Sequence, residues 1–180
     1  MLCVKTSPMT VPLAMFFHQS QTSVDFEIFL RFIRDNYGNF FGGAPYPKVI
    51  VTDDCSAERS ACRAVFPESK LWLCHQHLGK TFDGCHKSIA NKETSKAVAQ
   101  TMKQVMVDPL DISLVDNTIE AVLADPSFQD DDVQLYIRRY ANRKVEWMMA
   151  YRLNMLVGMQ HTTNASESQN SILKRNTLNG

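Results

Sequence analysis

Short apolar runs separate amphipathic segments in the first part of the chain. These runs, bounded by turn residues, predict strands at residues 2–5, 11–17, 48–52 and 71–73. Apolar residues at helical spacing predict one helix after the Thr22-Ser23 cap and another from about Ser56. The run at 48–52 is apolar at every central position, which is typical of a strand buried on both faces. The order strand, strand, helix, strand, helix, strand indicates an α/β sheet.

After the last of these strands the pattern becomes helical. Three groups of apolar residues at helical spacing predict amphipathic helices, separated by Pro109 and Pro126. We therefore expect three segments: the N-terminal part of an α/β core at 1–88, a helical insertion at 89–156, and a C-terminal helix at 157–180 that returns to the core.

Composition narrows the class of protein. No run approaches the roughly 18 to 20 apolar residues that cross a bilayer, so we expect no membrane partner. The five cysteines have no disulfide-framework spacing, which favours the cytosol or the nucleus. The net charge of zero argues against a strong autonomous nucleic-acid binder.

The charges are unevenly distributed along the chain. Residues 108–132 contain eight acids and no lysine or arginine, whereas the chain from Arg138 onward has seven basic residues and two acids. One interpretation is a pair of solvated helix faces. The other is a basic C-terminal surface that meets phosphates while the acidic stretch stays away from them.

Asp53 directly follows a predicted strand. Ligands of open α/β sheets bind at the carboxyl ends of the strands, and a carboxylate there suits a hard cation such as Mg²⁺. The alternative is that Asp53 or Asp54 caps the helix that begins near Ser56. We expect Asp54 to be a cap or a solvated acid rather than a metal ligand.

Glu167 is a second candidate acid. It lies among small polar residues at the start of a predicted helix, where an exposed acid is favoured by the helix dipole. Glu167 gains a metal-binding role only if the fold brings it to face Asp53.

Cys74 and His77 have the spacing of a metal-ligand pair. A closed zinc site needs four ligands, and the nearest supplements, Cys85 and His86, are adjacent and awkwardly placed to act together. The alternatives are a buried Cys74 that packs behind its strand, with a histidine near the active edge, or a cysteine nucleophile, for which no orienting Asp or Asn is apparent.

A series of short motifs follows along the chain: Val11-Pro12-Leu13-Ala14, Phe29-Leu30, Val49-Ile50-Val51-Thr52-Asp53, Ala61, Val65-Phe66-Pro67, Cys74-x-x-His77 and Thr163-Asn164-x-x-Glu167-Ser168-x-Asn170-x-x-Leu173-Lys174. In this order, the motifs resemble the catalytic core of Mutator-like element (MULE) transposases. The resemblance covers nearly the whole chain.

The resemblance implies an RNase H-like domain with an Asp-Asp-Glu site. Asp53 matches the second aspartate and Glu167 the glutamate, and both would bind Mg²⁺ or Mn²⁺ for cleavage and strand transfer of DNA. Lys174 and Arg175 are candidate DNA contacts. The resemblance also implies transposon-end DNA as partner, a nuclear location, and compatibility with an oligomer.

The chain departs from the family pattern at its start, where no aspartate precedes Asp25. We therefore expect the first strand and the first catalytic aspartate to be missing, and the chain alone to be inactive. Two alternatives stay open: a domesticated nuclear protein that binds DNA or protein without catalysis, and a small zinc-stabilised module built on Cys74 and His77.

Overall fold

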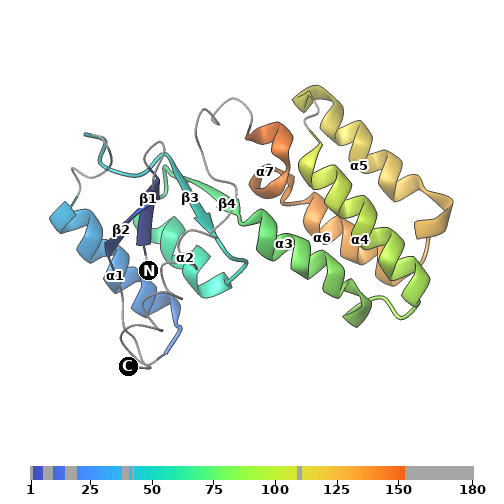
Figure 1. Ribbon diagram of the computed structural model, residues 1–180, viewed down its shortest axis with the longest axis horizontal. Helices are drawn as coiled ribbons and strands as arrows, with labels where there is room; N and C mark the ends of the chain where they lie inside the picture. Colours follow the sequence, from blue (N-terminus) through green and yellow to red (C-terminus); the bar gives the residue numbers. More distant parts are fainter. Residues whose placement is uncertain are drawn as a thin grey trace. The chain divides into compact units, whose positions relative to one another are not determined.

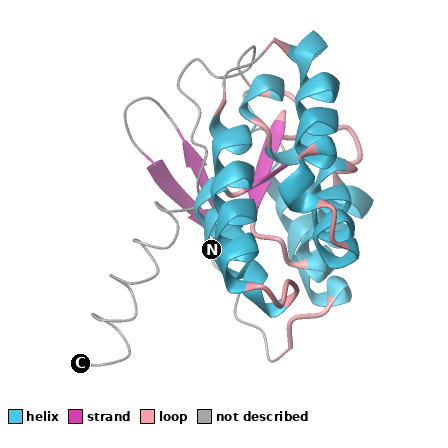
Figure 2. Cartoon of the chain, turned by 90° about the vertical axis from the view of Figure 1, so that its right-hand side faces the viewer, coloured by secondary structure: helices cyan, strands magenta, loops and turns pink. Residues whose placement is uncertain are grey.

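The protein is a mixed α/β chain that is mostly helical (Figure 2). The computed structural model describes residues 2–5, 10–14, 20–37, 41, 43–108 and 111–152. Contacts divide the chain into a first unit, Met1–Cys74 with Gly158–Gly180, and a second unit, His75–Val157. The segment boundaries that we expect at residues 88 and 156 stay predictions.

The first unit contains four described strands (Figure 1). Strand β1 (Leu2–Lys5) pairs antiparallel with β2 (Thr10–Ala14), and β3 (Val49–Thr52) pairs parallel with β4 (Lys70–Leu73). The predicted strand positions are confirmed, with shifts of one residue at three ends. Residues 15–17, which we expected to belong to the second strand, lie outside the described residues. Among the described residues the two pairs form separate two-stranded sheets. An RNase H-like sheet therefore stays a prediction.

Strand β3 is less buried than its apolar run predicts. Thr52 is buried, but Val49, Ile50 and Val51 are only half-buried. Within the described residues β3 has one hydrogen-bonded neighbour, β4. The prediction of a strand buried on both faces is therefore wrong for most of β3.

Helix α1 (Ser23–Tyr37) begins at a reciprocal cap, as the Thr22-Ser23 pair predicts. The Thr22 Oγ1 accepts a hydrogen bond from the Asp25 amide at 3.2 Å, and the Asp25 carboxylate accepts one from the Thr22 amide, also at 3.2 Å. This arrangement is a capping box with aspartate in the place of glutamate. Asp25 therefore has a local structural role.

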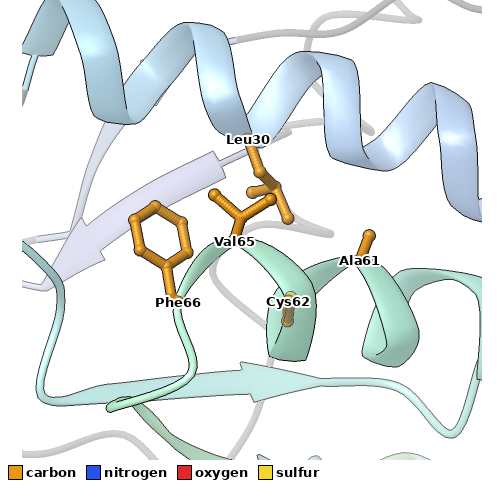
Figure 3. Packing of buried hydrophobic residues seen from close by; sticks show 5 residues of the cluster. All are labelled: Leu30, Ala61, Cys62, Val65 and Phe66. Carbon is orange, nitrogen blue, oxygen red and sulfur yellow. The ribbon is translucent and has the colours of Figure 1, made fainter.

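The core of the first unit lies between α1 and α2 (Ser56–Val65). Figure 3 shows Leu30 of α1 directed toward Val65 of α2, with Phe66, Cys62 and Ala61 beside it. All five side chains are buried. Helix α2 thus packs against α1 with one face. Because α2 follows β3 along the chain, this packing fixes the segment between them, which carries Asp53.

The second unit is helical throughout its described part. It contains α3 (His75–Asp83), α4 (Lys92–Val107), α5 (Val115–Ala124), α6 (Asp131–Ala141) and α7 (Lys144–Trp147), with 3₁₀ turns at Gly84–Lys87, Ile112–Leu114, Pro126–Phe128 and Met149–Tyr151. Helix α4 packs against both α3 and α6 (Figure 1). The three amphipathic helices that the sequence predicts are confirmed as α4, α5 and α6. No helix in the described ranges is long and apolar enough to cross a membrane.

Several acids of the stretch 108–132 cap helices of this unit. Asp111 accepts a hydrogen bond from the Ser113 amide at 2.8 Å, Asp125 from the Ser127 amide at 2.8 Å, and Asp130 from the Asp132 amide at 3.0 Å. A carboxylate at a helix N-terminus satisfies amides that have no partner within the helix. Part of the charge asymmetry in the sequence is therefore explained by capping.

The core of the second unit is centred on aromatic rings. The Phe82 ring meets Tyr140 and Trp147 edge to face, with centroid distances of 5.1 and 5.8 Å. Tyr136 lies 5.2 Å from Tyr140. Edge-to-face pairs at these distances add to the free energy of area burial.

Candidate metal centre

Asp53 and Cys74 leave neighbouring parallel strands at the same end. In the β3–β4 register Thr52 faces Leu73, and the Cys74 amide donates to the Thr52 carbonyl at 2.8 Å. Asp53 and Cys74 are the next residues of the two strands, so the register places them side by side at the carboxyl edge. Asp53 is half-buried and Cys74 is buried.

His77 belongs to the second unit. Helix α3 begins at His75, so His77 lies in the first turn of this helix.

Asp53 and Asp54 do not cap α2, contrary to the alternative that the sequence left open. The cap residue is Cys55, whose side chain makes no capping hydrogen bond; its carbonyl accepts from the Arg59 amide at 3.0 Å. The Asp54 carboxylate lies 3.9 Å from Arg59 Nε, an ion-pair contact. The helix thus begins one residue later than a cap at Asp54 requires.

Glu58 is a carboxyl group of this region that the sequence reasoning missed. Burial, and after it the negative charge of Asp53, raise the pKa of Glu58 from its ordinary value of 4.5 to about 7. The charge of Asp53 thus acts on a second acid whose pKa lies near neutrality. The sequence offered one signal for this residue, a glutamate in the first turn of the helix that follows Asp53. Its pKa, however, depends on burial, which the sequence does not show.

The Cys85-His86 pair, considered as a source of further zinc ligands, lies within the second unit. Cys85 is buried and donates its thiol to the Ser95 carbonyl at 3.0 Å, whereas the neighbouring His86 is exposed. Cys62 is buried in the core of the first unit, and burial raises its pKa to about 12. A zinc site built on Cys74 and His77 stays a prediction.

Three predicted site residues lie outside the described residues. These are Glu167, the predicted partner of Asp53, and the DNA-contact candidates Lys174 and Arg175. Their roles stay predictions, as does the C-terminal helix that would carry them.

The side chains of the candidate metal ligands Asp53, Cys74 and His77 suit two kinds of metal to different degrees. The oxygen of Asp53 is the ligand that Mg²⁺ or Mn²⁺ prefers, and its place at the strand edge fits the predicted role. A thiolate and an imidazole are poor ligands for Mg²⁺ and good ones for zinc. Of these three residues, only Asp53 therefore has the oxygen donor that a magnesium site needs.

Comparison with known families agrees with the motifs of the N-terminal segment. Residues 1–81 match the MULE transposase domain, which is 81 of the 180 residues and includes Asp53, Cys74 and His77. No curated protein and no solved structure matches the chain. The resemblance stated from the sequence is thereby confirmed over residues 1–81, the segment that matches the MULE transposase domain.

Proposed function

We propose that the chain carries part of a transposase catalytic domain, in which Asp53 is a metal-binding carboxylate for phosphodiester chemistry on DNA. The observation that carries the proposal is the position of Asp53. It follows β3 at the carboxyl edge of a parallel strand pair, inside the segment that matches the family.

The chemistry assigns a definite task to this carboxylate. A divalent cation bound there would polarise the phosphate and stabilise the charge on the attacking and leaving oxygens. Asp53 would hold that cation through oxygen, from a half-buried position where its negative charge is less screened than in bulk water. Glu167 would supply a further oxygen ligand in this proposal.

The remaining parts of the proposal concern fold, partner and location. An RNase H-like sheet, contacts from Lys174 and Arg175 to DNA phosphates, and a nuclear location follow from the resemblance, and they are supported by the domain match over residues 1–81. The expectation that the chain alone is inactive stays a prediction.

Binding of Mn²⁺ tests the role of Asp53 without requiring catalysis. We expect Asp53→Asn to weaken Mn²⁺ binding by about tenfold or more, because the amide removes the charge of the principal oxygen ligand. The free Mn²⁺ signal in electron paramagnetic resonance, measured while the full chain is titrated, gives the dissociation constant.

Asp54→Asn is the matched control for this titration. Asp54 is adjacent in sequence, carries the same charge and contacts Arg59, so its replacement should change the affinity for Mn²⁺ by less than about twofold. Equal weakening by both variants would show only a general effect of charge. Unchanged affinity in Asp53→Asn would remove the proposed role.

A further inference from the structure

Helix α1 of the first unit carries a row of exposed apolar side chains. Val24, Ile28 and Phe32 follow one another at four-residue spacing and are 62%, 61% and 54% exposed. Side chains at this spacing lie about 40° apart around a helix, so the three share one face. Leu30 and Ile33, which are buried, lie on the opposite side of α1. We call Val24, Ile28 and Phe32 the α1 stripe.

The α1 stripe differs from an isolated apolar residue on a surface. The Phe32 ring meets Tyr37 edge to face at a centroid distance of 5.9 Å, which extends the apolar surface toward the end of the helix. Leu135 of the second unit is 72% exposed, but Arg138 and Arg139 occupy the next positions on its helix face. Single exposed apolar residues are ordinary, whereas contiguous ones mark interaction surfaces.

The charges of α1 indicate which partner fits the stripe. Asp25 and Glu27 give the first half of the helix a negative charge. Arg31 and Arg34 give the second half a net positive charge, even with Asp35 beside them. An antiparallel copy of α1 therefore places unlike charges opposite one another, whereas a parallel copy places like charges together. The dipoles of two antiparallel helices also attract each other.

We propose that two copies of this chain pack their α1 stripes together, with the helices antiparallel, and form a homodimer. A two-fold axis at Ile28 brings the two Ile28 side chains together. It also places the smaller Val24 of each copy against the larger Phe32 of the other. Glu27 and Arg31, which form an ion pair at 3.4 Å within the helix, lie on one flank of the stripe. Across the axis, each Arg31 faces the Glu27 of the other copy.

The size of the stripe sets the strength of the dimer. A standard interface buries about 800 Å² on each partner, which is more than three side chains of one helix supply. The dimer is therefore weak, and its population depends on protein concentration. Exposed ion pairs add little affinity, so the apolar stripe holds the copies together and the charges set their direction. Asp53 has no part in this surface, so the dimer and the proposed metal role stand independently.

Sedimentation velocity of the full chain, from about 1 µM to about 1 mM, tests the dimer. We expect the wild type to change from monomer to dimer within this range. Ile28→Glu places two like charges at the axis and should weaken association by at least about tenfold. Leu135→Glu adds the same charge at another exposed apolar position and should leave association unchanged. Circular dichroism and thermal unfolding of Ile28→Glu should match the wild type, because the side chain is exposed.

Exchange of charges tests the antiparallel direction. Glu27→Arg and Arg31→Glu each place like charges opposite one another in the dimer, so each should weaken association by at least about threefold. An equimolar mixture of these two variants should associate more strongly than either alone, because the facing charges are then opposite. A wild type that stays monomeric, an Ile28→Glu variant that associates like the wild type, or a mixture no stronger than its components would overturn the proposal.

Discussion

Replacing Trp147 with alanine is expected to destabilise the helical second unit by about 3 to 5 kcal/mol, the usual cost of deleting a large buried aromatic side chain. Trp147 is 0% exposed, and its ring meets Phe82 edge to face. Its indole donates to the Tyr140 carbonyl at 2.9 Å. Alanine would leave a cavity and a carbonyl without this donor, and both add to the cost.

The environment of Trp147 also includes a buried histidine. The backbone carbonyl of Trp147 lies 2.6 Å from His75 Nε2, and since a carbonyl only accepts, this nitrogen carries the proton. Displacing the backbone around residue 147 would weaken this hydrogen bond as well.

Urea denaturation followed by circular dichroism measures the effect. Val145→Ala is the matched control, because Val145 belongs to the same short helix α7 and is 53% exposed. Its replacement should change the free energy of unfolding by less than about 0.5 kcal/mol. If Trp147→Ala lowers the free energy of unfolding by less than about 1 kcal/mol, the central position of this ring in the core is contradicted.

Replacing Glu58 with glutamine is expected to stabilise the protein at neutral and higher pH. Burial and the charge of Asp53 raise the pKa of Glu58 from 4.5 to about 7. This rise corresponds to about 3 kcal/mol in favour of the protonated form in the folded state. The stabilising contribution of protonated Glu58 to the free energy of unfolding is complete below about pH 4.5, and it is lost as the pH rises through about 7.

Glutamine is neutral at every pH and similar in shape to the protonated acid. At about pH 8 we therefore expect Glu58→Gln to be more stable than the wild type by up to about 3 kcal/mol, and near pH 4.5 we expect little difference. Thermal unfolding in a chelating buffer at several pH values measures this, with Asp53 free of metal.

Glu68→Gln provides the comparison for the pH series. Glu68 is exposed, so its removal should shift stability by less than about 0.5 kcal/mol at each pH. A stability difference for Glu58→Gln that stays the same from pH 4.5 to pH 8 would contradict a buried, titrating carboxyl.

Local signals in the sequence predict the secondary structure well. The Thr22 cap and the apolar spacing that includes Leu30 locate α1, and the alternation of short apolar runs and turns locates the strands. These features depend on neighbouring residues along the chain. The sequence left the cap of α2 open because several polar residues precede the helix, and only the backbone identifies Cys55.

Features that depend on tertiary structure were harder to predict. Cys74 and His77 were recognised as a pair from their spacing, but the proximity of Cys74 to Asp53 follows from the β3–β4 register, which the sequence does not specify. The raised pKa of Glu58 likewise arises from burial in the fold. The half-burial of β3 differs from the prediction because an apolar run alone does not tell how many neighbours a strand has.

The central claim is that this domain binds metal through Asp53, and anomalous X-ray diffraction tests it most directly. Crystals of the full chain soaked in Mn²⁺ should show a peak at bonding distance from the Asp53 carboxylate. Manganese peaks that all lie away from Asp53 would contradict the account.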